Sequence, residues 1–288
     1  MDSIAVQQLA TALLIPLGVA FIAYKTRSFD LSGALAGFVV MAIHFWADFR
    51  FGAMLLVFFF TSSVLAKVGQ EKKRLVYADF MEGGQRNWIQ VLSNSCIATI
   101  LVVALWDLTG GSGLCLDSVK SPSITSLVGG IIGHYSCCSG DTWSSEFGVL
   151  SDTQPRLITN SKRVQKGTNG GVTKAGLVAA AGAGTLIGLT FITVGVLSKE
   201  CTHVATWKQL LVIPLAALAG LCGSVIDSLL GATLQFSGFC SVRKKVVSKP
   251  APTVKRISGR RILDNNAVNF AATFLTSLLT AFICLCVF

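Results

Sequence analysis

Apolar stretches of about twenty residues recur along the whole chain and are separated by short polar segments. Coiled as an α-helix, each stretch is long enough to cross roughly 30 Å of hydrocarbon. Helices satisfy their own backbone hydrogen bonds, as a membrane requires. The expected spans are 5–24, 31–47, 51–66, 88–106, 124–147, 171–197, 208–236 and 267–287. The pattern therefore predicts an all-α fold: a polytopic membrane helix bundle of about eight transmembrane helices, forming one integral membrane domain over 1–288.

The distribution of lysine and arginine supports this count. With these spans, all of the 24 basic residues lie in alternate loops except Arg50, Lys120, Lys199 and Lys208. Cytosolic loops are enriched in lysine and arginine, so both chain ends are expected outside the cytosol. Cys115 and Cys201 would then share the non-cytosolic side, where a bridge between them can form.

Composition narrows the class of partner. Only 13% of the residues are charged and 52% are hydrophobic, which excludes an ordinary soluble domain. The net charge of +10 is divided among short loops. That arrangement favours the lipid bilayer and anionic lipid or phosphate as partners, and it counts against a nucleic acid.

Three acidic residues fall within predicted spans, where an ionisable side chain is costly and needs a reason. Asp141 and Glu146 lie in the fifth span and Asp227 in the seventh. His134 shares a helical face with Asp141, whereas Asp141 and Glu146 converge only if the helix breaks, for which Gly140 offers a place. A carboxylate cluster would bind Mg²⁺, a cation that prefers oxygen ligands. The alternative is that each acid pairs with a loop arginine or lies just outside the bilayer.

A basic loop follows the fifth span and ends in a glycine-rich turn that opens the sixth helix. A helix N-terminus offers free N–H groups, and glycines let a phosphate approach the backbone. The spacing is not that of a Walker A motif, and an ordinary positive-inside loop is the alternative. The candidate phosphate ligands are Arg156, Lys162, Arg163, Lys166, Gly167, Thr168, Gly170 and Gly171, together with Arg86.

Two further polar clusters open the fourth and eighth spans. Gln90 and Asn94 share a helical face, as do Asn265 and Asn269. All the clusters fall at the cytosolic ends of helices, so they predict one polar site at the membrane–cytosol boundary. The expected lining residues are Asn87, Gln90, Asn94, Asn265 and Asn269. The basic segment 241–261, which contains Pro250 and Pro252, is expected to be irregular.

Several of these segments resemble the signature of a known membrane family. They are Gly140-Asp-Thr-Trp-Ser-Ser-Glu-Phe-Gly148, the stretches 155–159 and 162–172, and the stretches 83–87, 223–233 and 264–269. Together they are similar to the transmembrane protein 19 family, formerly a domain of unknown function. This family includes the plant phytyl phosphate kinase, which adds a phosphoryl group to an isoprenoid monophosphate.

The resemblance implies roles for the matching residues. Asp141, Glu146 and Asp227 would be catalytic and hold a metal with a nucleotide, CTP or ATP. The basic loop and its glycine turn would bind phosphates, and an isoprenyl phosphate or similar lipid phosphate would lie between spans five, seven and eight. Gln165 departs from the family pattern, in which proline is expected.

The sequence therefore supports two possible functions. The first is an isoprenoid or lipid-phosphate kinase working at the cytosolic face. The second is a non-catalytic membrane regulator of glucose-responsive growth, because the length and lack of a plastid leader bring the chain nearer to the extraplastidic plant member than to the kinase. A transporter is a weaker third reading, since no inverted repeat is evident. The plasma membrane or endoplasmic reticulum is expected rather than the plastid.

Overall fold

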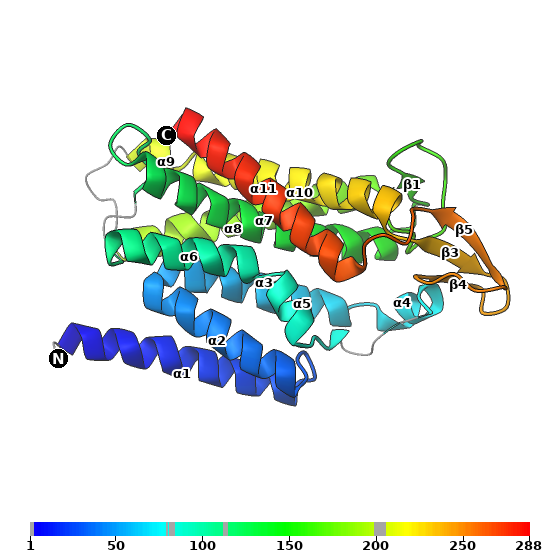
Figure 1. The fold of residues 1–288 in the computed structure, drawn as a ribbon, viewed down its shortest axis with the longest axis horizontal. Coiled ribbons are helices and arrows are strands. Elements are labelled where there is room, and N and C mark those ends of the chain that lie inside the picture. The colour runs from blue at the N-terminus through cyan, green and yellow to red at the C-terminus, as the bar shows by residue number, and fades with distance from the viewer. Residues whose placement is uncertain (1–2, 79, 81–83, 112–114, 199–205) are drawn as a thin grey trace.

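The computed structural model describes residues 3–78, 80, 84–111, 115–198 and 206–288. The predicted positions Gly83, Lys199 and Cys201 lie outside these ranges, while Cys115 is disulfide-bonded. The long helices lie roughly side by side (Figure 1). The helices are α1 (Ser3–Lys25), α2 (Leu31–Ala47), α3 (Phe49–Lys67), α4 (Gln70–Val76), α5 (Trp88–Ser93), α6 (Cys96–Thr109), α7 (Pro122–Leu150), α8 (Lys174–Leu197), α9 (Thr206–Gln209), α10 (Val212–Leu234) and α11 (Asn265–Val287).

Short strands gather at one end of the bundle, and both chain ends lie at the other (Figure 1). The strands are β1 (Arg156–Leu157), β2 (Gly171–Val172), β3 (Ser237–Cys240), β4 (Lys245–Val247) and β5 (Val254–Ser258). β1 pairs antiparallel with β2, and β3 lies between β4 and β5 in a second antiparallel sheet. We call this the basic end; it comprises segments 68–78, 84–87, 151–173 and 235–264. The prediction that the segment 241–261 is irregular is therefore wrong, because β4 and β5 within it pair with the two edges of β3.

Membrane crossing is supported directly for part of the predicted set. Five helical segments are long and apolar enough to span a bilayer: 8–25, 49–67, 174–197, 207–234 and 265–287. α2 and α6 are apolar but shorter. α7 is enclosed by other helices, with an unbroken run of buried residues over 128–140. The number of crossings, about eight, stays a prediction.

The fourth predicted span is not one helix. α5 opens at Asn87, whose side chain accepts from the Gln90 N–H in a reciprocal capping box, and it ends at Asn94. The Asn94 side-chain amide donates to the Gln90 carbonyl at 2.9 Å, and the Ser95 hydroxyl donates to the Val91 carbonyl at 2.8 Å. These side chains compete for the backbone carbonyls, so the helix stops and restarts as α6.

The break at Gly140 that would bring Asp141 and Glu146 together does not occur, since α7 runs through it unbroken. Gly140 serves packing instead. A Cβ at this position would lie 2.4 Å from the Gly220 carbonyl oxygen of α10, so only glycine allows the two backbones to meet. Gly184 of α8 packs against α10 in the same way, since a Cβ there would lie 2.1 Å from the Ala216 carbonyl oxygen. These contacts lock α7, α8 and α10 into one unit that carries the acidic residues.

Candidate functional site

Two of the three predicted acids meet in the structure. Asp141 on α7 and Asp227 on α10 approach within hydrogen-bonding reach of each other. The Asp227 Oδ2 atom is buried and has no hydrogen-bond partner among the described residues. Two carboxylates this close repel each other unless they share a proton or a cation lies beside them. The pair is therefore an incomplete arrangement that a ligand would complete.

A cavity of about 110 Å³ lies beside this pair. It is bounded by α7, α10 and the turn between β1 and β2, and its lining offers many oxygen atoms. The polar lining residues include Asp141, Ser144, Thr168, Asn169, Thr173, Asp227 and Ser228. Carboxylate, hydroxyl and carbonyl oxygens are the ligands that Mg²⁺ prefers, so the residues present fit this ion.

Glu146 does not join the two aspartates, so the predicted three-carboxylate metal site is not assembled. Because α7 is continuous, Glu146 points to another face of the helix and forms an ion pair with Lys73 of α4. Lys73 also donates to the Leu65 carbonyl at 2.6 Å and the Ala66 carbonyl at 3.1 Å. Over the ranges that the structure describes, no three His, Cys, Asp or Glu side chains gather closely enough for a metal. An ion at the aspartate pair would therefore need further oxygens from water or substrate phosphates.

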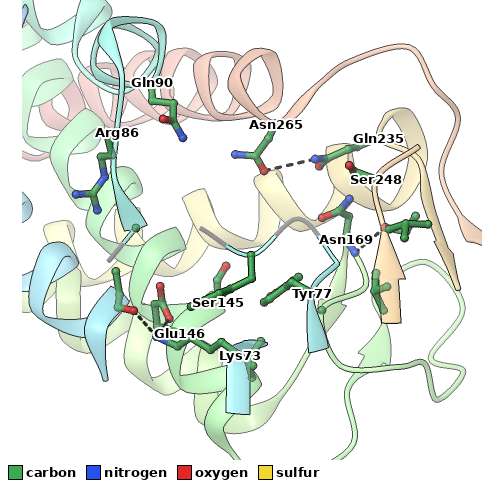
Figure 2. Close-up of a pocket in the computed structure, with 18 of the residues that line it drawn as sticks. Lys73, Tyr77, Arg86, Gln90, Ser145, Glu146, Asn169, Gln235, Ser248 and Asn265 are labelled. Atoms are coloured by element: carbon green, nitrogen blue, oxygen red, sulfur yellow. Dashed lines mark hydrogen bonds and ion pairs between the residues drawn. The ribbon is translucent and has the colours of Figure 1, made fainter. Parts of the chain in front are cut away.

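A larger cavity of about 480 Å³ adjoins the small one at the basic end. Residues 77, 145, 149, 167, 169, 235 and 265 line both. Figure 2 shows Arg86 and Gln90 on one side of this larger cavity and Asn265 with Gln235 on the other. Glu146 and its partner Lys73 lie across from them. We call the two spaces together the polar cavity.

Arg86 is held firmly at the wall of the polar cavity. Its backbone N–H donates to the Ser28 carbonyl, and its carbonyl accepts from the Asp30 N–H, both at 3.0 Å. Its guanidinium donates to the Ser63 hydroxyl at 3.0 Å. Burial lowers the pKa of this guanidinium, and the Glu146 carboxylate opposes that shift. Arginine stays protonated in either case, so Arg86 presents a fixed positive charge to the cavity.

Tyr77 forms part of the boundary between the two cavities. Burial raises the pKa of its phenol, and the Glu146 and Asp141 carboxylates raise it further. The phenol therefore remains protonated and able to donate a hydrogen bond.

The predicted phosphate-binding loop divides into two groups. Lys166, Gly167, Thr168, Gly170 and Gly171 line the small cavity. Lys166 donates to the Val149 carbonyl at 3.3 Å and also to the Ser151 carbonyl, which ties it to the end of α7. The remaining predicted ligands point to solvent and line neither part of the polar cavity: Arg156, Lys162 and Arg163.

The predicted amide lining is likewise only partly present. Gln90 and Asn265 line the polar cavity, and the Gln235 amide donates to the Asn265 side-chain oxygen at 3.4 Å. Asn94 and Asn269 instead hydrogen-bond to each other at 3.4 Å. Asn87 serves as the N-cap of α5.

Sequence reasoning missed several residues of the cavity wall. Lys73, Tyr77, Ser145, Asn169, Gln235 and Ser248 all line it. Lys73 is only 4% exposed, whereas Lys72 and Arg74 on either side are exposed. No sequence signal separates these three adjacent cations, because the packing of α4 against α7 selects one of them. Gln235 reaches the cavity because α10 ends at this residue, where its side-chain amide donates to Asn265 of α11.

A helix bundle with apolar spans and a polar, acid-containing cavity at one end defines a multi-pass integral membrane protein. The chain belongs to the family described as Integral membrane protein DUF92, whose model matches residues 14–277. It is 65% identical to Protein PGR of Arabidopsis thaliana, with 95% of each chain covered. This result confirms the predicted likeness to the plant member of the family.

More distant relatives occur outside plants. An uncharacterized membrane protein of Methanocaldococcus jannaschii is 28% identical, with 80% of this chain and 85% of the relative covered. One of Synechocystis is 25% identical, with 68% of each chain covered. No solved structure matches this chain.

Proposed function

We propose that this protein is a lipid-phosphate kinase that works at its basic end. One observation carries the proposal: a pair of carboxylates, with one buried oxygen that has no partner among the described residues, lines the small cavity together with Lys166, and Arg86 lines the larger cavity that adjoins it. Among the described residues, neither aspartate forms an ion pair, and neither do Arg86 and Lys166. A metal and phosphates bound together would complete such a site. The implied co-substrates are CTP or ATP and an isoprenyl phosphate or similar lipid phosphate.

The chain's own residues would act by position and charge. Asp141 and Asp227 would hold Mg²⁺, which when bound neutralises charge on the transferring phosphoryl group. Arg86 would orient the lipid phosphate, and Lys166 with the N–H groups of Gly167 and Gly170 would bind nucleotide phosphates. The other N–H groups of this turn, those of Thr168, Asn169 and Gly171, already donate hydrogen bonds within the fold.

The reaction needs no general base. An oxygen of the lipid phosphate attacks the γ-phosphorus, and the bond from that phosphorus to the β-phosphate oxygen breaks. The products are a lipid diphosphate and a nucleoside diphosphate. The attacking oxygen is already ionised at neutral pH, so catalysis rests on alignment and electrostatic stabilisation.

The direct test is phosphoryl transfer by the purified protein in liposomes. Labelled CTP or ATP with Mg²⁺ would be offered with phytyl, geranylgeranyl or longer isoprenyl phosphates. Asp141→Asn should reduce the rate at least about a thousandfold, because it removes a charge that holds the metal. Asp152→Asn is the matched control, since Asp152 is exposed just beyond the end of α7.

Diphosphate formed by wild type and by Asp152→Asn, but not by Asp141→Asn, supports the kinase. Equal rates for all three proteins would refute the role given to Asp141. No product from any pair, together with tight lipid-phosphate binding, would favour the non-catalytic regulator. The membrane that we propose, plasma membrane or endoplasmic reticulum, is tested by imaging a fluorescent fusion.

A further inference from the structure

A narrow apolar pocket adjoins the polar cavity inside the bundle. Its volume is about 40 Å³, and it lies between α2, α3 and α5. Arg86 and Gln90 line both this pocket and the larger part of the polar cavity. The other lining side chains are predominantly hydrophobic, with Phe29, Val40, Met41, Leu55, Phe58 and Phe59 among them. We call this space the apolar pocket.

The interruption between α5 and α6 helps to create the apolar pocket. α5 packs against α2, and the Asn94–Ser95 turn forms part of the wall. On the opposite wall, the Phe29 and Phe59 rings lie 4.7 Å apart. A Cβ at Gly37 would come within 2.8 Å of the Phe29 ring, so glycine leaves room for that ring. A continuous helix over 88–106, as predicted from sequence, would not place this turn beside the pocket.

Beyond the small part of the polar cavity, the expected groove between α7, α10 and α11 is closed where glycines bring these helices together. Gly140 of α7 lies against the Gly220 backbone of α10. Gly133 of α7 lies against Thr280 of α11, where a Cβ would come within 2.4 Å of the threonine hydroxyl oxygen. Helices that meet through glycines in this way leave no room for a lipid chain.

We propose that the apolar pocket receives the first carbons of a single-chain lipid phosphate, whose phosphate lies against Arg86 in the polar cavity. The identity of the head group rests on the proposed function. Arg86 forms no ion pair with any described residue, and its guanidinium donates to the neutral Ser63 hydroxyl. A phosphate is the complement of such a charge, and an apolar chain is the complement of the adjoining wall.

The shape of the apolar pocket selects the class of lipid. The walls are formed by buried side chains, with Met41 3%, Leu55 7% and Phe59 7% exposed. A space this narrow admits one slender chain after small side-chain adjustments, and not the paired chains of a glycerolipid. Isoprenyl monophosphates and single-chain alkyl phosphates belong to the class that fits.

Photolabelling of the full-length protein tests the proposal without any need for turnover. Farnesyl phosphate with a diazirine near its head group would be irradiated with the protein in phosphatidylcholine vesicles, without nucleotide. Mass spectrometry of the peptides should place the label on Met41, Leu55 or Phe58. Excess unlabelled farnesyl phosphate should suppress it, whereas excess phosphatidic acid should not.

Filling the apolar pocket should prevent labelling. Leu55→Trp is expected to lower labelling at Met41 and Phe58 about tenfold, because the buried contacts of several chain carbons are lost. Leu35→Trp is the matched control, since Leu35 lies on the outer surface of α2 and is 62% exposed. Met41→Phe is a milder second variant, should Leu55→Trp fail to fold.

The outcomes separate this inference from the proposed function. Labelling in the pocket with no phosphoryl transfer would support the lipid site and refute the kinase. Transfer together with labelling only on α7, α10 or α11, or only on outward-facing residues, would support the kinase and overturn the pocket. Equal labelling of wild type, Leu55→Trp and Met41→Phe would also overturn it.

Discussion

The two ends of the bundle bury acidic residues in different ways. At the end opposite the basic end, Asp48 caps α3 and pairs with Arg50, whose Nη2 lies 2.6 Å from the Asp48 Oδ2. The Arg50 Nε lies 3.1 Å from both carboxylate oxygens, and its guanidinium stacks 5.0 Å from the Phe191 ring centre. At the basic end, Asp141 and Asp227 face each other, and among the described residues they have no cationic partner and one of their oxygens has no hydrogen-bond partner.

This difference separates a structural ion pair from a candidate ligand site. A buried charge with all of its partners in the chain needs nothing further to be stable. Two partly buried carboxylates that oppose each other lower stability, and a fold keeps such an arrangement where a ligand makes use of it. Both ends contain acids in apolar surroundings, so burial alone does not mark a functional site. What marks the candidate functional site is that the hydrogen bonding and ion pairing of its acids are incomplete.

The largest effect on stability is expected at the structural pair. Arg50→Met leaves the Asp48 carboxylate buried without its cation, so the free energy of unfolding should fall by about 3–5 kcal/mol. Unfolding in mixed detergent micelles, followed by circular dichroism, would measure this. Asp48→Asn combined with Arg50→Met should recover much of the loss. A change below about 1 kcal/mol in the single variant would show that the pair is not structural.

At the aspartate pair, a substitution is expected to raise the free energy of unfolding rather than lower it. Asp227→Asn removes like-charge repulsion, so without divalent cations the free energy of unfolding should rise by about 1 kcal/mol. Wild type should gain about 2.7 kcal/mol when Mg²⁺ is present at a hundred times its Kd, and the variant should gain none. Thermal unfolding with and without MgCl₂ makes the comparison. An equal response to Mg²⁺ in both proteins would place the ion elsewhere.

An intermediate effect on stability is expected at the Lys73–Glu146 ion pair. This pair borders the polar cavity, but each of its two charges has its partner within the chain. Lys73→Met should cost more stability than Glu146→Gln, because Lys73 also donates to two carbonyls at the end of α3. A double-mutant cycle should give a coupling energy of about 0.5–3 kcal/mol. Additive effects would show that the two side chains act independently.

The smallest effect is expected for the exposed cations of the β1–β2 loop. Lys162→Ala should change the free energy of unfolding by less than about 0.5 kcal/mol and leave phosphoryl transfer unchanged. Lys166→Ala, in the same loop but beside the small cavity, should reduce transfer. Assaying the two variants together tests whether cavity lining or loop membership decides function. Equal losses of phosphoryl transfer in the two variants would mean that membership of the loop, and not a place in the cavity wall, decides function.

Much of the site could be predicted from residue type and position, and the failures have specific causes. Asp141, Asp227, Arg86 and Lys166 were predicted as site residues, and the structure brings all four to the polar cavity. Glu146 was grouped with the aspartates on the assumption of a break at Gly140. That assumption was wrong because glycine in a membrane helix serves close packing as readily as bending.

The sequence by itself determined most of the apolar helices, the interrupted fourth span excepted, and that most of the basic residues gather at one end. Those properties depend on local composition and on the hydrocarbon solvent, which acts on each span separately. The tertiary structure alone decided which acids meet, which of three adjacent cations is buried, and where a lipid chain can lie. Each of these depends on a contact between distant segments, such as Gly140 against Gly220 or α4 against α7. Such contacts are set by the joint packing of several helices, which no single segment encodes.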